Sequence, residues 1–148
     1  MIYTEKSGDL FSASQEYYLA HCIFGDYALG AGIAKMFNKV YDMKMKLKEI
    51  YPIEDGMVYG HVGEALLVDN VFNLVTKARY FYKPTYDSLH TTLVEMKKQC
   101  EESGITKLAM PRIGSGLDKL DWVKVEDMIK DVFDDMDIEI VVYVLPAQ

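Results

Sequence analysis

Two side chains in this chain, those of Lys77 and Asp118, could act together on a reactive carbon. Lys77 directly follows Thr76 at the end of a strand-like run over 71–76, so its amine should emerge at the edge of the sheet where ligands bind. An amine attacks carbon only in its uncharged form, which partial burial or a neighbouring cation favours. Asp118 could serve as general base and then acid, although a nearby carboxylate favours the charged amine. The alternative to a catalytic pair is that Lys77 is a solvent-exposed lysine and Asp118 a turn aspartate. Spacing alone favours this alternative.

Two glycine-containing loops, one before a predicted helix and one after a predicted strand, have positions that suit the binding of an anionic ligand. One is Gly30-Ala31-Gly32-Ile33 at the start of a helix, and the other runs from Pro111 to Asp118 after a short strand. Glycines let a backbone approach a ligand closely, and a helix N-terminus offers unpaired N–H groups. Two such loops facing one crevice would hold a pyrophosphate without a cluster of lysines. The dinucleotide fingerprint fails because Lys35 stands at its third glycine position, and a simple turn remains the alternative for the first loop.

For most of the other reactive side chains, an ordinary structural role accounts for the residue type. His21 lies in an apolar run, where a core imidazole is the usual role, and His61 and His90 lack metal-ligand spacing. Cys22 points to the opposite strand face from His21, so the two do not make a catalytic pair. Asp9 is either a turn residue or a carboxylate that accepts a hydrogen bond from a purine amino group. We therefore expect no metal site and no cofactor.

Apolar patterning predicts the elements that must position these residues. Strand-like runs lie at 2–4, 19–23, 58–62, 65–68, 71–76, 108–110 and 138–145, and helical spacing covers 33–50, 86–102 and 122–136. Asp121 suits the N-cap of the last helix, and Gly104 suits the end of the middle one. Helices that alternate with buried strands predict a three-layer α/β domain with a mixed sheet, whose ligands bind beyond the C-terminal strand ends.

Composition narrows the protein class. The chain has 148 residues, 50% of them hydrophobic and 26% charged, which fits one globular domain over 1–148. A net charge of −7 disfavours stable binding to duplex nucleic acid or anionic lipid. A stripe of lysines on the first helix is expected to be a solvated face; it comprises Lys35, Lys39, Lys44, Lys46 and Lys48. With two cysteines, no secretory pattern and no long apolar run, we expect a cytoplasmic monomer with buried thiols.

Taken together, the sequence resembles the macro domains, and most closely the branch of terminal ADP-ribose protein glycohydrolase. The resemblance covers nearly the whole chain. It is carried, in order and spacing, by the segments Lys6–Phe11, Leu19–Ile23, Gly30–Ala34, Thr76–Lys77, Lys83–Tyr86, Met110–Asp118 and Val142–Leu145.

The resemblance implies an α/β/α macro-domain fold that binds ADP-ribose or an ADP-ribosylated protein or nucleic acid. It assigns Lys77 as the nucleophile on the anomeric carbon of the distal ribose, and Asp118 to proton transfer and resolution of the adduct. It further implies removal of ADP-ribose from acidic residues, O-acyl esters or nucleobases. The expected ADP-ribose contacts are Asp9, Leu10, His21, Gly30, Ala31, Gly32, Ile33, Thr76, Arg112, Ile113, Gly114, Ser115, Gly116, Leu117, Tyr143 and Leu145.

Three departures from the family pattern matter. The segment Ala20–Ile23 replaces the asparagine-rich strand end of many macro hydrolases, so their substrate-assisted water mechanism does not transfer. Phe24 stands where the close branch often has serine, and Ser115 stands where cysteine is also seen. Two alternatives stay open, namely a phosphatase acting on ADP-ribose 1″-phosphate and a non-catalytic reader of ADP-ribosylation.

Overall fold

A computed structural model describes residues 1–54, 56–78, 85–116 and 119–145 of the chain. Strands and helices alternate along most of it, as the apolar pattern predicts. The elements are β1 (Ile2–Ser7), the short 3-10 helix η1 (Leu10–Ser12), β2 (Tyr18–Phe24), α1 (Gly32–Tyr41), α2 (Met43–Ile50), β3 (Ala65–Val68), β4 (Val71–Lys77), α3 (Tyr86–Ser103), β5 (Lys107–Pro111), α4 (Trp122–Phe133) and β6 (Glu139–Val144).

The six strands form one sheet in the order β1-β6-β5-β2-β4-β3. Every neighbouring pair is parallel except β3 and β4, which form an antiparallel hairpin at one edge. The predicted mixed sheet is confirmed. Because five strands run in the same direction, their C-terminal ends lie along the same side of the sheet, where the loops that follow them can meet.

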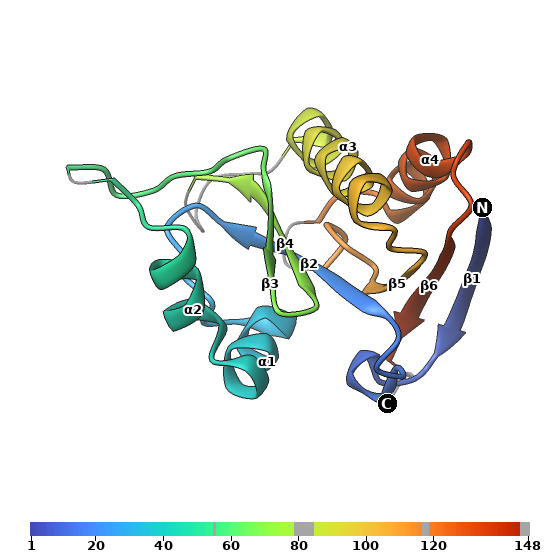
Figure 1. Cartoon of the computed structure of the whole chain (residues 1–148), viewed down its shortest axis with the longest axis horizontal. Helices are drawn as coiled ribbons and strands as arrows, with labels where there is room; N and C mark the ends of the chain where they lie inside the picture. Colours follow the sequence, from blue (N-terminus) through green and yellow to red (C-terminus); the bar gives the residue numbers. More distant parts are fainter. Residues whose placement is uncertain (55, 79–84, 117–118, 146–148) are drawn as a thin grey trace.

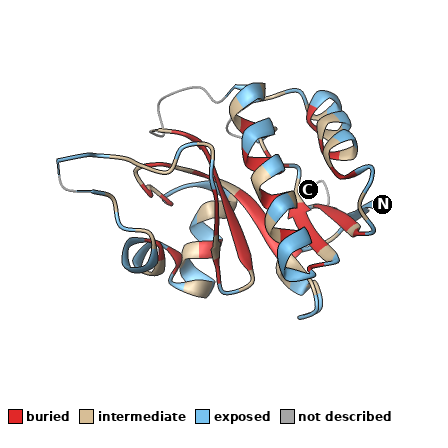
Figure 2. Cartoon of the chain, turned by 45° about the horizontal axis from the view of Figure 1, so that its top comes forward, coloured by how far each residue is buried: buried red, intermediate tan, exposed pale blue. Residues whose placement is uncertain are grey.

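Helices cover both faces of the sheet (Figure 1). On one face α3 and α4 pack through buried side chains such as Leu93 and Phe133, and on the other α1 and α2 pack through Phe37 and Leu47. Figure 2 shows buried strands between helices whose outer surfaces are exposed. The predicted three-layer α/β/α architecture is therefore confirmed.

The long helix predicted over 33–50 is two helices. Asp42 separates them in a left-handed conformation, with φ 56° and ψ 43°, and its N–H donates to the Asn38 carbonyl at 2.9 Å. The Asn38 side chain in turn accepts from the N–H of Lys44 at 2.9 Å. Aspartate is among the few residues that enter this conformation at low cost, so the chain bends without glycine or proline. Both helices bury an apolar face against the sheet. The apolar residues over 33–50 therefore keep helical spacing across the break, and the sequence pattern resembles that of one helix.

The helix ends predicted from single residues are confirmed. Asp121 is the N-cap of α4, and its carboxylate accepts from the N–H of Val123 at 3.0 Å. Gly104 ends α3 with φ 68°, a left-handed conformation that suits glycine. The last helix is shorter than its pattern, because it ends at Phe133 rather than at 136.

The strand predicted over 58–62 is wrong. No strand forms there, and Val58 and Val62 are 57% and 45% exposed. At the end of β2, the N–H of Gly60 donates to the Gly25 carbonyl at 3.0 Å. Composition alone suggested a strand here, but a strand also needs a neighbour along its length.

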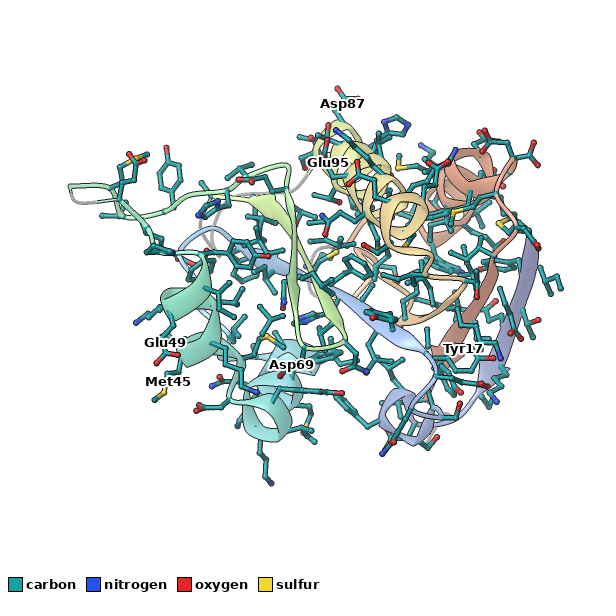
Figure 3. The ribbon with its side chains drawn as sticks, viewed as in Figure 1. Tyr17, Met45, Glu49, Asp69, Asp87 and Glu95 are labelled. Atoms are coloured by element: carbon teal, nitrogen blue, oxygen red, sulfur yellow. The ribbon has the colours of Figure 1, made fainter. Side chains whose placement is uncertain are left out.

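The lysine-rich face of α1 and α2 lies outside the core, as predicted. Lys35, Lys39, Lys44 and Lys48 are exposed. Lys46 is half-buried and forms an ion pair with Asp69, Nζ to Oδ2 2.6 Å, in the turn between β3 and β4. In Figure 3 the labelled side chains of Met45 and Glu49 also point outward from α2. Across the described ranges, no helix combines the length and apolarity that crossing a membrane requires.

Candidate active site

A cleft of about 1120 Å³ opens beside the C-terminal ends of the parallel strands. Its walls come from residues at or just after the ends of β1, β2, β4, β5 and β6. That is the place where doubly wound sheets bind ligands, and the volume is sufficient for a nucleotide. Both predicted glycine loops and Lys77 line this same cleft.

Lys77 is the last residue of β4 and is only 8% exposed. The pairing of β2 with β4 slips by one residue at this point: Ile23 is opposite Val75, but Phe24 is opposite Lys77. The slip brings Lys77 beside the ring of Phe24, with Nζ 4.4 Å from the ring centroid. Lys77 therefore lies at the wall of the cleft, beside an aromatic ring.

The first glycine loop leads into the N-terminus of α1. Gly32 is the first residue of the helix and has φ 59°, a left-handed conformation that favours glycine. Ala31 is the N-cap and makes no side-chain hydrogen bond to the first turn. Gly32, Ile33 and Ala34 line the cleft, so the positive end of the helix dipole faces the ligand space. This geometry suits a phosphate group.

The second glycine loop forms another wall of the cleft, from Pro111 to Gly116. Gly114 has φ 74°, and a Cβ on it would lie 3.1 Å from Cδ1 of Leu120, whose N–H donates to the Gly114 carbonyl at 2.7 Å. Ser115 closes the turn by donating its hydroxyl to the Arg112 carbonyl at 2.8 Å. Leu117 and Asp118, which the sequence also assigns to this site, lie outside the described residues.

Arg112 lines the cleft, but its charge is already engaged. Its Nε donates to Oε1 of Glu5 on β1 at 2.5 Å, and its guanidinium carbon lies 5.8 Å from the centre of the Trp122 ring. A charge held by a carboxylate contributes less to binding an anion. The cradle for an anion at this wall therefore consists mainly of backbone.

The remaining wall combines the ends of β1 and β6. Asp9 is exposed there and accepts from the N–H of Phe11 at 3.0 Å as the N-cap of η1, so its role as a turn residue is confirmed. Asp9 also lines the cleft, so a role as turn residue is compatible with the expected role as acceptor for a purine amino group. Tyr143 packs against Gly8, whose Cβ would lie 3.5 Å from the ring, and Leu145 beyond it is 73% exposed.

Two residues of the expected ligand set, His21 and Thr76, are not among the residues that line the cleft. His21 is fully buried, with Nε2 2.6 Å from Oδ1 of Asn73 and its ring stacked on Phe37 at 3.9 Å between centroids. Burial lowers the pKa of His21 to about 4, so the imidazole is neutral near pH 7. Its role as a core histidine is confirmed. Thr76 is 2% exposed and is the residue that the register slip leaves out of the pairing.

Sequence reasoning did not assign several cleft residues to the ligand. Most of them lie at strand ends or in the loops that follow, which was the available signal, whereas Phe11 lies in η1 and Ala34 and Met36 lie in α1. They are Gly8, Phe11, Cys22, Ile23, Phe24, Ala28, Ala34, Met36, Pro111 and Val144. Within the described part of the chain, no group of three or more histidine, cysteine or carboxylate side chains is arranged to hold a metal ion.

Comparisons with known proteins agree with this architecture. No family model matches the chain. The human protein "ADP-ribose glycohydrolase OARD1" is 42% identical over 144 residues, which is 96% of this chain and 91% of the human protein. The macrodomain of Mycobacterium tuberculosis DarG superposes with a TM-score of 0.82 at 24% identity, covering 99% of both chains. Thermosipho africanus DarTG, solved in complex with ADP-ribose, matches with a TM-score of 0.73 at 17% identity, over 98% of this chain and 42% of that one.

The structural matches share too few residues to establish more than the fold. The human relative, in contrast, is similar along almost the entire length of both chains. The segments that suggested a macro domain come from most of that length, and the sheet and cleft have the arrangement that the resemblance implies. The chain therefore belongs to the ADP-ribose glycohydrolase family of macro domains.

Proposed function

We propose that this protein is an ADP-ribosyl hydrolase that removes mono-ADP-ribose from acidic side chains, O-acyl esters or nucleobases, with Lys77 as its nucleophile. The observation that carries the proposal is the position of the Lys77 amine. It lies at the wall of a cleft that two glycine loops also line, and Lys77 itself is only 8% exposed. The 42% identical relative, named as an ADP-ribose glycohydrolase, supports the same activity.

The cleft suits the diphosphate of ADP-ribose without relying on a net positive charge. The N-terminus of α1 and the backbone of the Pro111–Gly116 loop supply hydrogen-bond donors and partial positive charge. Asp9 would accept from the adenine amino group, and Leu10, Tyr143 and Leu145 would contact the adenosine end. The distal ribose would then point toward Lys77.

The first chemical step is displacement at the anomeric carbon of the distal ribose. The lone pair of Lys77 Nζ forms a C–N bond to that carbon, and the bond from that carbon to the leaving group breaks. The leaving group keeps the electron pair, as a carboxylate when the substrate is an ester and as a nucleobase that takes up a proton otherwise. A covalent ADP-ribosyl-lysine adduct remains.

The second step releases the product. Water adds its oxygen to the anomeric carbon, the C–N bond to Lys77 breaks, and the amine regains a proton. Family resemblance assigns proton transfer in both steps to Asp118, which would accept a proton from the attacking amine or from water and return it to the departing group. The net reaction consumes one water and yields free ADP-ribose.

The test compares Lys77→Ala with a matched lysine variant, Lys44→Ala, which changes an exposed side chain on α2 that does not line the cleft. Turnover is measured on a panel of ADP-ribosylated glutamate peptide, O-acetyl-ADP-ribose, ADP-ribosylated thymidine and guanosine, and ADP-ribose 1″-phosphate. Calorimetry measures ADP-ribose binding. We expect Lys77→Ala to abolish turnover while its Kd stays within about threefold of the wild-type value, and Lys44→Ala to match the wild type.

The panel also separates the alternatives. Release of phosphate from the 1″-phosphate, with none of the other substrates cleaved, would identify a phosphatase. Binding of ADP-ribose without any product would identify a reader. Full turnover by Lys77→Ala would rule out the lysine nucleophile. A monomeric state, a cytoplasmic location and the lack of stable duplex nucleic acid binding stay predictions.

A further inference from the structure

Phe24 is the aromatic side chain that contacts Lys77 in the cleft wall, with Lys77 Nζ 4.4 Å from its ring centroid. We propose that Phe24 is a positioning residue, whose ring holds the Lys77 amine in the orientation from which it attacks the ligand. The inference rests on the proposed role of Lys77 as nucleophile and adds a second residue to that chemistry. The ring itself forms no bond and transfers no proton.

The first argument is that the contact depends on a local departure from regular sheet pairing. Up to Ile23 and Val75, β2 and β4 pair residue by residue, so regular pairing would place Phe24 opposite Thr76. Thr76 is skipped instead, and Phe24 pairs with Lys77. In a parallel pair, opposite residues point to the same face, and a one-residue slip changes that face. Without the slip, the Lys77 side chain would leave β4 on the face away from Phe24.

The pairing resumes immediately after the slip, so backbone pairing holds the two strands together both before and after the skipped residue. The N–H of Gly25 donates to the Lys77 carbonyl at 2.8 Å. Bulges of this kind recur beside active sites, where they redirect one side chain. The side chain redirected here is the one amine in the part of the cleft that the structure describes.

The second argument concerns the lysine stem. Lysine has a flexible four-carbon stem, so its amine reacts efficiently only when its surroundings hold it near the sugar carbon. The face of an aromatic ring packed against the amine limits the positions that the amine can reach, with or without a proton on the nitrogen. Phe24 is half-buried and Lys77 is 8% exposed, so this contact is shielded. The ring therefore restricts the amine to a narrow set of positions at the cleft wall.

A matched control exists at the other end of the sheet. Lys107, the first residue of β5, has its Nζ 5.5 Å from the Tyr17 ring centroid, and it also forms an ion pair with Glu16 at 2.9 Å. Neither Tyr17 nor Lys107 lines the cleft. Tyr17→Leu therefore removes an aromatic ring from a lysine contact of the same kind without touching the proposed site.

The experiment compares Phe24→Leu, Phe24→Tyr and Tyr17→Leu with the wild-type full chain. Leucine keeps an apolar side chain but has no ring, whereas tyrosine restores the ring. The main readout is the single-turnover rate at which Lys77 acquires the ADP-ribosyl group, followed by acid quench and peptide mass spectrometry. The Kd for ADP-ribose and the thermal midpoint are measured for every variant.

We expect Phe24→Leu to slow adduct formation by about tenfold, because the amine is no longer held at the cleft wall near the sugar carbon, with the Kd within about threefold of wild type. Phe24→Tyr should restore the rate to within about threefold of wild type, and Tyr17→Leu should leave it unchanged. The positioning role is overturned by an unchanged rate in Phe24→Leu. It is also overturned by a tyrosine variant as slow as the leucine variant, because a role in packing alone predicts no rescue by the ring.

The outcomes also separate this inference from the proposed function. If Lys77 never acquires the ADP-ribosyl group in the wild type although ADP-ribose is released, the lysine nucleophile is wrong and the inference falls with it. If the adduct forms on Lys77 at the same rate in Phe24→Leu, only the role of Phe24 is wrong. A loss of ADP-ribose binding that parallels the loss of rate would make Phe24 a ligand contact instead.

Discussion

Gly25 and Gly60 are in backbone contact at the end of β2. The N–H of Gly60 donates to the Gly25 carbonyl at 3.0 Å, and a Cβ on Gly25 would lie 2.8 Å from the Gly60 carbonyl oxygen. The N–H of Gly25 also bonds to the carbonyl of Lys77. The same glycine thus joins the loop after α2 to the strand end that carries the proposed nucleophile.

Gly25→Ala is expected to destabilise the protein, because a methyl group cannot fit at 2.8 Å from a backbone oxygen without moving one of the two segments. A loss of about 1–3 kcal/mol in the free energy of unfolding is typical of such overpacking. Chemical denaturation measures it. The control is Gly30→Ala, where a Cβ would have no atom within 4 Å, and which should change stability by less than about 0.5 kcal/mol. Equal stability of the two variants would contradict the close contact.

Stability should fall as the pH drops from about 6.5 toward 4.5, in part because of His21. Burial lowers the pKa of His21 to about 4 in the folded protein, compared with its ordinary value of 6.5. Between these values the unfolded chain binds a proton that the folded protein does not, so acid favours unfolding. The loss is on the order of 2 kcal/mol over this range. Denaturation across a pH series measures it.

The control for this effect is His21→Gln, whose amide does not titrate and can still donate to Asn73. The variant should be less stable at pH 7 but should show a flatter pH dependence between 6.5 and 4.5. His90→Ala removes an exposed histidine on α3 and should leave the wild-type slope intact. A slope that persists in His21→Gln would mean that another group is responsible.

The two cysteines should differ in reactivity. Burial raises the pKa of Cys100 to about 12, which disfavours the reactive thiolate, whereas Cys22 is half-buried and lines the cleft. Iodoacetamide should therefore modify Cys22 first in the native protein, and ADP-ribose should slow that modification. Peptide mass spectrometry over a time course follows both sites. Cys22→Ser should abolish the early labelling, and prior labelling of Cys100 would contradict the assignment.

Removal of the α4 N-cap should cost about 1 kcal/mol. Asp121→Ala loses the hydrogen bond from its carboxylate to the N–H of Val123, together with the favourable charge at the helix N-terminus. Asp121→Asn keeps a side-chain oxygen acceptor and should recover most of the loss. Thermal or chemical denaturation compares the three proteins. An alanine variant as stable as the wild type would show that the cap contributes little.

Features that depend on neighbouring residues in the chain were predictable from the sequence. The apolar runs gave the six strands, and Asp121 and Gly104 marked helix ends, because capping and helix periodicity are local. The two glycine loops and Lys77 were placed correctly at one cleft, since the ends of parallel strands converge in any sheet of this class. The family resemblance added ADP-ribose as the expected ligand.

Features that depend on pairing between distant segments were not predictable. The slip that leaves out Thr76 is a property of two strands together, and neither strand's own sequence marks it. The apolar run at 58–62 resembles a strand, but among the described residues it forms no strand ladder; the N–H of Gly60 bonds to Gly25 and the carbonyl of His61 accepts from Glu64. The break at Asp42 contains neither glycine nor proline, the residues that usually mark a helix end in a sequence, so the sequence did not indicate it.

The cleft draws its walls from Gly8 near one end of the chain to Leu145 near the other, and from three strands in between. No contiguous fragment therefore contains the whole cleft, so the proposed nucleotide binding requires the segments near Gly8 and Leu145 to be packed in place. A bound nucleotide would therefore raise the free energy of unfolding of the entire sheet and not only that of a single loop. The size of the increase depends on the nucleotide concentration relative to its Kd. Ligand-induced protection from hydrogen exchange should thus spread to both sequence extremities at once.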